Sequence, residues 1–197
     1  MLGFKLCGVR ITISFWFFAA IGFFLLYERS ALFWYFAAPV VVHELGHMVA
    51  LYACGGGLLS LELCAFGINM RPNSRYLSYF REFIVILAGI ASNALLAIIL
   101  LALKGQTMRS MLLISVNLAV AAFNLLPIGN LDGGILLKLF CERTSNGFIA
   151  YKISRAVSFT LLLPLLIFAF HLTFQNERNF SLLIVCIYLS GILVLEG

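Results

Sequence analysis

Long apolar runs alternate with short polar segments along nearly the whole chain. The runs are as long as the roughly 17–25 residues that a helix needs to cross a bilayer. Six of them can be marked, at residues 11–27, 31–53, 83–103, 110–126, 157–174 and 180–196. The pattern therefore predicts an all-α polytopic membrane protein with about six transmembrane helices.

The segment between the second and third runs has a different period. Gly55, Gly56 and Gly57 are typical of the end of a helix, and within residues 58–70 apolar and polar side chains alternate. A period of two predicts a short strand or hairpin, which we expect at the cytoplasmic interface. Its free edge could pair with an extended peptide, or the segment could merely pack over the helix ends.

The composition supports the membrane assignment. Hydrophobic residues make up 63% of the 197, charged residues 11%, and the mean hydropathy is +1.07, whereas soluble domains are about half apolar and about a quarter charged. We expect one membrane-embedded domain over residues 1–197 and no separate soluble domain. The first run follows Lys5 and Arg10 but lacks a small-x-small cleavage site, so we interpret it as a retained span.

The basic residues between the runs indicate the orientation of the chain. With the N-terminus in the cytoplasm, the cytoplasmic segments hold Lys5, Arg10, Arg71, Arg75, Arg81, Lys138, Arg143, Lys152 and Arg155, and the outer loops hold Arg29, Lys104, Arg109 and Arg178. The formal charge of +5 then reflects topology and gives no reason to expect nucleic acid. The five cysteines form no C-x-x-C pair, so we expect reduced thiols that fill space.

The second apolar run contains the sequence VVHELGHMVA, which places His43, Glu44 and His47 in a region where polar groups are costly. Residues four apart lie on one face of a helix, one turn along. The two imidazoles can therefore bind one ion, and Glu44 lies beside it, where it can accept a proton from the attacking water. The alternative is a structural one, two buried histidines that share a proton with Glu44.

A catalytic zinc ion normally takes three protein ligands, so a third must come from elsewhere. The candidates are Glu62, His171, the cysteines and Asp132, the only aspartate in the chain. By the span count, Asp132 and the histidine pair lie at the same cytoplasmic end, whereas His171 lies at the outer end. Asp132 can therefore reach the ion, and His171 is interpreted as an interfacial histidine.

Two asparagines accompany these residues. Asn124 begins a break in the fourth run, in which Pro127 and later glycines interrupt the helix before Asp132. Irregular backbone at membrane depth is tolerated where it lines a wet cavity, and hydrolysis needs one. Asn93 lies in the third run among small residues that suit close helix packing. Both asparagines are candidate donors to an oxyanion.

The motif His43-Glu44-Leu45-Gly46-His47, followed by Asn124-Leu-Leu-Pro127 and Leu131-Asp132-Gly133-Gly134, resembles that of site-2 proteases, zinc metalloproteases that cut within or beside the membrane. The compact layout is similar to the bacterial sporulation-type branch. The resemblance implies one zinc ion per chain on His43, His47 and Asp132, with Glu44 as general base. It also implies a prokaryotic cell membrane, a site toward the cytoplasm and a membrane-embedded or membrane-tethered protein as substrate.

The chain departs from the family pattern at two positions. Ile90 and Asn130 stand where the family often has proline, which changes local backbone rigidity and substrate fit but not the ligand set. We also expect no nucleotide-sensing or PDZ domain, so that regulation would come from substrate presentation or from a membrane partner.

Two other functions fit some of these residues. In a transporter or channel, intramembrane His, Glu and Asp side chains would line an ion path, although neither an inverted repeat nor charges dispersed over several spans are visible. An inactive member of the same family would bind clients without cutting them. The intact Glu44 favours the protease, for which we expect regulated intramembrane proteolysis, with release of a transcription-factor precursor as one outcome.

Overall fold

The computed structural model describes residues 2–6, 8–15, 17–18, 22, 32–64, 67–72, 77–103, 107–175 and 181–195. These residues belong to two compact units, Met1–Ala122 and Phe123–Gly197. The expectation of a single membrane-embedded domain stays a prediction.

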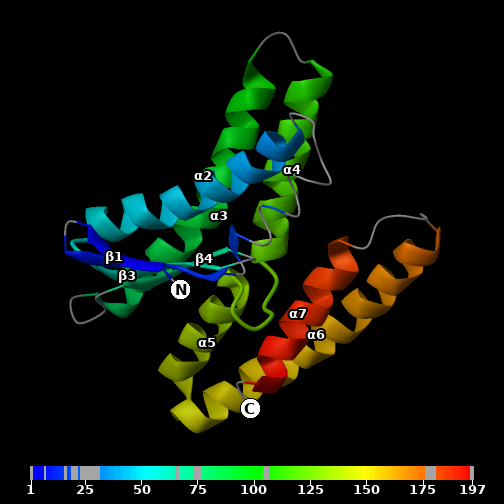
Figure 1. Cartoon of the computed structure of the whole chain (residues 1–197). Helices are drawn as coiled ribbons and strands as arrows, with labels where there is room; N and C mark the ends of the chain where they lie inside the picture. The colour runs from blue at the N-terminus through cyan, green and yellow to red at the C-terminus, as the bar shows by residue number, and fades with distance from the viewer. Residues whose placement is uncertain are drawn as a thin grey trace. The chain divides into compact units, whose positions relative to one another are not determined.

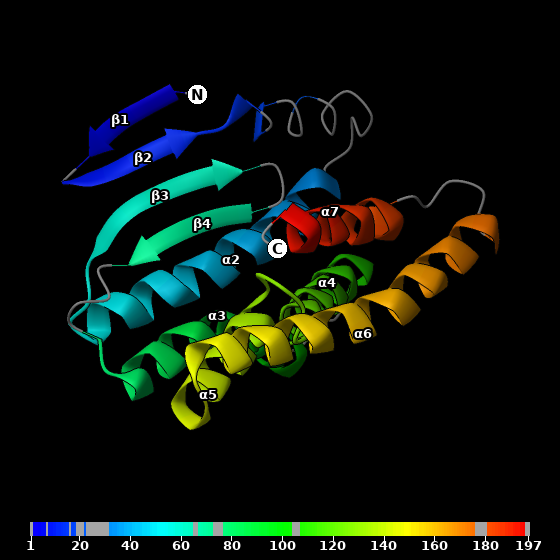
Figure 2. The same ribbon diagram turned by 90° about the horizontal axis from the view of Figure 1, so that it is seen from below.

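The first unit contains a four-stranded sheet with the strand order β1-β2-β3-β4 (Figure 2). The hairpin of β1 (Leu2–Leu6) and β2 (Val9–Ile13) is antiparallel, β2 runs parallel to β3 (Leu58–Cys64), and β3 is antiparallel to β4 (Gly67–Pro72). The predicted hairpin after the second apolar run is thus confirmed.

The sheet also corrects the first predicted span. Residues 11–13, expected in a helix, lie in β2. Their β-branched residues alternate with polar ones from Val9 onward, so this stretch fits a strand, but it merges into the apolar run that follows. Most of the remaining residues of span 11–27 lie outside the described residues.

Helix α2 (Leu32–Ala53) ends where the glycines predicted. Gly55 has a φ of 77° and its N–H donates to the carbonyl oxygen of Tyr52 (3.0 Å), while the N–H of Gly56 donates to that of Leu51 (2.9 Å). This pair of bonds is a Schellman motif, in which glycine adopts the left-handed conformation at low cost. The guanidinium of Arg81 also donates to the carbonyl oxygen of Cys54 (3.0 Å). The chain therefore leaves α2 in a fixed direction toward β3.

Helices α2 and α3 (Tyr79–Ala102) pack against each other. Gly89, Asn93 and Ala97 are buried at four-residue spacing on one face of α3, whereas large apolar residues such as Leu95 and Ile98 are exposed. Small and polar residues inside with large apolar residues outside are typical of a helix surrounded by lipid. This is the face of α3 from which the histidine motif on α2 is supported.

Helix α4 (Met108–Asn124) ends close to the boundary between the units. The second unit then contains α5 (Asp132–Thr144), α6 (Gly147–Gln175) and α7 (Ser181–Leu195). Helices α6 and α7 lie side by side (Figure 1). The buried core of this unit is formed by Ile128, Leu162, Leu189 and Leu193. Ile128 belongs to the connection that leads to α5, so the core holds that connection in place.

Three described helical stretches are long and apolar enough to cross a membrane, Trp34–Ala53, Tyr79–Ala102 and Gly147–Gln175, and Met108–Asn124 and Leu182–Val194 are apolar but shorter. The mostly helical membrane fold is thus supported, while the count of six spans is not confirmed. Helix α5 was not predicted, and α6 begins ten residues before the expected span at 157–174.

Candidate metal centre

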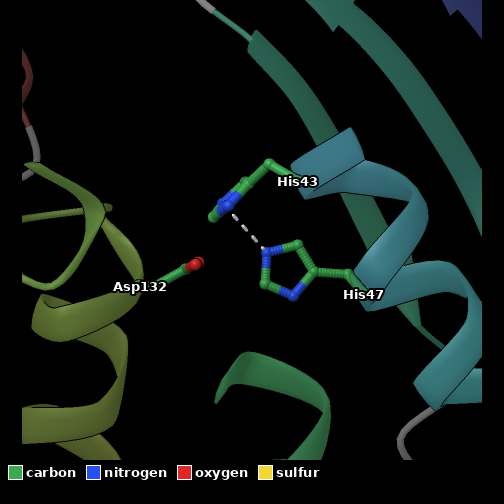
Figure 3. A group of neighbouring side chains, drawn as sticks. All are labelled: His43, His47 and Asp132. Atoms are coloured by element: carbon green, nitrogen blue, oxygen red, sulfur yellow. Dashed lines mark hydrogen bonds between the residues drawn. The ribbon is translucent and has the colours of Figure 1, made fainter. Parts of the chain in front are cut away.

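The two histidines of the motif lie one turn apart on α2 and turn toward each other (Figure 3). Their Nε2 atoms are 3.2 Å apart, and their rings are nearly perpendicular, at 88°, with centroids 4.7 Å apart. His43 is buried and His47 is partly buried. The helical spacing thus brings one ring nitrogen of each residue to the same point.

A backbone group of α3 fixes the ring of His47. Its Nδ1–H donates to the carbonyl oxygen of Val85 (2.8 Å), and because a carbonyl oxygen can only accept, the proton must be on Nδ1. In the neutral ring, Nε2 then has a lone pair, and this is the atom that faces His43. Histidine ligands of metals typically donate their other N–H to such a partner, which sets both tautomer and orientation.

The spacing of the two Nε2 atoms fits a shared zinc ion. Zinc–nitrogen bonds are about 2.0–2.1 Å long, so two nitrogens in a tetrahedral site are separated by about 3.3–3.4 Å. The observed 3.2 Å is close to this value. The two histidines therefore offer the type of donor atom and the spacing that zinc requires from a His-x-x-x-His pair.

One face of α3 supports both rings. Val85, Gly89 and Asn93 follow one another at four-residue spacing and therefore lie in one row. A Cβ atom on Gly89 would lie 2.5 Å from Cε1 of His47 and still closer to its Nε2. The amide of Asn93, which is fully buried, lies 3.5 Å from Nδ1 of His43. Glycine thus leaves room for one ring, and asparagine contacts the other.

The close approach of α2 and α3 depends on a second glycine. A Cβ atom on Gly46 would lie 2.6 Å from the carbonyl oxygen of Ala88 and equally close to Oγ of Ser92. The Ser92 hydroxyl lies within hydrogen-bond distance of the carbonyl oxygens of Gly89 (2.7 Å) and, across the helix pair, Val42 (3.0 Å). The Gly46 inside the motif is therefore required for helix packing, which brings Val85 and Asn93 within reach of the histidines.

In the second unit, Asp132 is the first residue of α5 and is buried (Figure 3). The chain folds back on this helix start. A Cβ atom on Gly133 would lie 2.6 Å from the carbonyl oxygen of Leu126, and one on Gly134 would lie 2.9 Å from that of Ile128. Bare glycine backbone is needed for this approach. The glycines after Asp132 thus hold the preceding turn against α5 and fix the position of Asp132.

A serine of α6 anchors the same turn. The N–H of Gly129, whose φ is 50°, donates to Oγ of Ser158 (2.9 Å), and the buried Ser158 hydroxyl donates to the carbonyl oxygen of Ser154 (2.7 Å). A buried N–H without a partner costs about 1–3 kcal/mol. Ser158 therefore ties the broken segment, predicted from Pro127, to the core of the second unit.

The remaining candidates have distinct positions. Glu44 is half-buried on α2, next to His43, and Asn124 is the half-buried last residue of α4. Of the alternative third ligands, His171 is exposed on α6, and Glu62 lies in β3 in register with Asn69. Sequence reasoning missed Val85 and Gly89. A backbone carbonyl has no sequence signature, but the small residues around Asn93 were a usable signal for Gly89.

Three comparisons bear on these observations. Residues 104–168 match the model of peptidase family M50. A protein of Synechocystis sp., sll0528, whose name is that of a zinc metalloprotease, is 37% identical over 109 residues, which are 51% of this chain. The chain covers 28% of the length of that relative.

The whole fold also has a counterpart among solved structures. The site-2 protease from Methanocaldococcus jannaschii superposes with a TM-score of 0.67 at 22% identity, and the match covers 99% of this chain and 94% of that one. At this level of identity the likeness is one of fold. The family match includes the segment from Asn124 to Asp132, and the histidine motif precedes it in the chain.

Proposed function

We propose that the chain, which is similar to peptidase family M50 in sequence and to a site-2 protease in fold, is an intramembrane zinc metalloendopeptidase. Its substrates are membrane-embedded or membrane-tethered proteins. Membership of the sporulation-type branch, with release of a transcription-factor precursor, is part of this proposal. The observation that carries the proposal is the pair of Nε2 atoms 3.2 Å apart, one of them fixed by Val85.

The ligand set that we propose is His43, His47 and Asp132, which offers two imidazole nitrogens and one carboxylate oxygen for one ion per chain. Two histidines with one carboxylate are a common set for catalytic zinc. When bound, the ion supplies Lewis acidity that polarises a scissile carbonyl and acidifies water. Apolar helices long enough to span a membrane support a site within the bilayer. The N-terminus and the site are proposed to face the cytoplasm of a prokaryotic cell.

The residues of the chain then have separate tasks. Glu44, half-buried beside His43, takes the proton of the attacking water and passes it to the leaving amide nitrogen. Asn124 donates to the oxyanion that forms at the carbonyl. The edge strand β4 steadies an unwound substrate by strand pairing, which matters because a helical substrate hides its carbonyl groups from attack.

The test is cleavage of a single-span membrane protein by the purified full chain in proteoliposomes, with wild type compared with Glu44→Gln. General acid–base catalysis contributes about 10²–10⁴-fold, so we expect turnover to fall by that factor while zinc content stays constant. Glu142→Gln, which changes an exposed carboxylate on α5, is the matched control and should cleave as wild type does. Equal cleavage by Glu44→Gln and wild type would remove Glu44 from the mechanism.

The same preparation separates the protease from the other two functions. Zinc or proton flux without peptide cleavage would indicate a transporter, and client binding without cleavage by the wild type would indicate an inactive family member. Addition of a zinc chelator should abolish cleavage, and added zinc should restore it.

A further inference from the structure

We propose that Asn93 is a positioning residue for His43, whose amide holds the imidazole at Nδ1 and can serve either tautomer of the ring. The proposal rests on the proposed function, because it concerns how His43 presents Nε2 to an ion. It assigns Asn93 a task different from the oxyanion donor that the sequence suggested.

The position of Asn93 relative to the His43 ring is the first observation. The two nitrogens of an imidazole are separated by Cε1, and their bonding directions diverge strongly. Nε2 of His43 faces His47 at 3.2 Å, whereas Nδ1 faces the amide of Asn93 at 3.5 Å. Asn93 thus faces a different nitrogen of the ring from the one at which an ion would bind. An amide there is placed to orient the ligand and not to contact the substrate.

The protonation of the histidine pair is the second observation. Because Nδ1–H of His47 donates to Val85, Nε2 of neutral His47 has no proton. Without an ion, the short contact between the two Nε2 atoms therefore needs a proton on Nε2 of His43. Nδ1 of His43 is then an acceptor, and an N–H of the Asn93 amide lies opposite it. In the metal-free protein, each donor in this arrangement therefore faces an acceptor.

With an ion bound, the roles of the two ring nitrogens of His43 would be reversed. Its Nε2 would then give its lone pair to the metal, so the ring proton must be on Nδ1, where it needs an acceptor. A primary amide offers both two donors and an acceptor, so Asn93 can supply Oδ1 by a half-turn of its terminal torsion. Oδ1 of Asn93 is buried and has no hydrogen-bond partner among the residues that the structure describes. No described hydrogen bond of this oxygen is therefore lost when the amide turns.

The two roles of the amide determine which side chains can replace Asn93. A carboxylate can only accept, so Asn93→Asp would support the metal-binding tautomer alone. An apolar side chain of similar size, as in Asn93→Leu, would support neither. The second fully buried asparagine, Asn117 on α4, donates to the carbonyl oxygen of Leu113 in its own helix (2.8 Å). Asn117→Leu is therefore a matched control for the loss of a buried amide.

The first measurement is the zinc dissociation constant of the purified full chain in detergent, by competition with a chelator of known affinity. Loss of the partner of a ligating histidine typically weakens metal binding about 10–100-fold. We expect a loss of this size for Asn93→Leu, and binding within a few-fold of wild type for Asn93→Asp and Asn117→Leu. Binding by Asn93→Leu as tight as that of wild type would overturn the proposal.

The second measurement reads the tautomer directly and does not depend on activity. The chain has three histidines, so ¹⁵N-histidine labelling gives few signals, and His171→Gln assigns one of them. In wild type, we expect the proton of His43 to move from Nε2 to Nδ1 when zinc is added. In Asn93→Asp, Nδ1 of His43 should carry a proton already in the metal-free protein, because the carboxylate can only accept.

The outcomes separate this inference from the proposed function. If wild-type protein does not bind zinc, the proposed function fails. If wild type binds zinc but His43 has the same tautomer with and without the ion, only the role of Asn93 is wrong. Should Asn93→Leu not fold, the ring protonation measured in metal-free Asn93→Asp decides, and an Nδ1 of His43 without a proton there would contradict the proposal.

Discussion

Replacement of Gly89 by alanine is the sharpest structural test of the candidate metal centre. Gly89 faces the ring of His47, and an added Cβ atom would lie 2.5 Å from Cε1 and 2.8 Å from Cδ2, and closest to Nε2. Nonbonded carbon atoms normally approach to about 3.5–4.0 Å. The ring must therefore move by about 1 Å, at the atom that we propose as a zinc ligand.

The ring has little freedom to move by this amount. Its Nδ1–H is held by the carbonyl oxygen of Val85, only one turn of α3 before Gly89. Rotation away from the new methyl group would break that bond, and metal–ligand distances tolerate only about 0.2 Å. We therefore expect zinc binding to weaken by at least the about 10–100-fold seen when an outer partner of a ligand is lost.

The effect on stability should be small by comparison. Alanine is favoured over glycine inside a helix by about 1 kcal/mol, whereas overpacking costs about 1–3 kcal/mol. The two terms oppose each other, so the free energy of unfolding should fall by about 0–2 kcal/mol, against a usual total of about 5–15 kcal/mol. The variant should therefore fold and still fail to hold zinc.

The assay pairs metal content after dialysis with the midpoint of thermal unfolding. Gly191→Ala on α7 is the control, because a Cβ atom there meets nothing within 4 Å, and it should retain zinc. If Gly89→Ala retains zinc with wild-type affinity, then His47 does not bind the ion in the orientation described, and the reasoning from Val85 and Gly89 is wrong.

Two further changes test the second unit. Ser158→Ala leaves the N–H of Gly129 without its side-chain acceptor, so the free energy of unfolding should fall by about 1–3 kcal/mol. Thr160→Ala removes an exposed hydroxyl that donates to the carbonyl oxygen of Ala156 within α6, so it should change the free energy of unfolding little. Equal unfolding midpoints for the two variants would contradict the anchoring role of Ser158. Asp132→Asn should lower the zinc content of the purified protein without unfolding it. Metal analysis measures the first effect and circular dichroism the second. Full zinc occupancy of this variant would exclude Asp132 as a required ligand.

The sequence predicted those parts of the fold that follow from local periodicity. The end of α2 at Gly55 and the hairpin after it were predicted correctly, because left-handed glycine and two-residue alternation are local signals. The strand at Val9–Ile13 was missed because its alternation is short and runs into an apolar segment. Helix α5 was missed because Gly133 and Gly134 suggested a break, whereas here they let the turn pack against the helix start.

In the candidate site, too, groups with a local signal could be predicted from the sequence, and groups placed by tertiary packing could not. His43 and His47 were recognisable because their spacing alone places them on one helical face. The carbonyl of Val85 was not, since every residue has one and its partner is 38 positions away in the sequence. Only the packing of α2 on α3 determines which carbonyl is in reach. Sequence reasoning therefore identified the groups that carry chemistry but not those that orient them.

The row of small and polar residues on α3 has consequences beyond helix association. In a membrane, small residues let two helices approach closely, and that alone would explain Gly89. However, the approach also brings a backbone acceptor to His47 and an amide to His43, so the same packing sets the tautomer of His47 and places a hydrogen-bonding partner at Nδ1 of His43. A change that separates α2 from α3 should therefore lower zinc affinity before it unfolds the protein. The histidine motif is thus a binding site only in combination with its neighbouring helix.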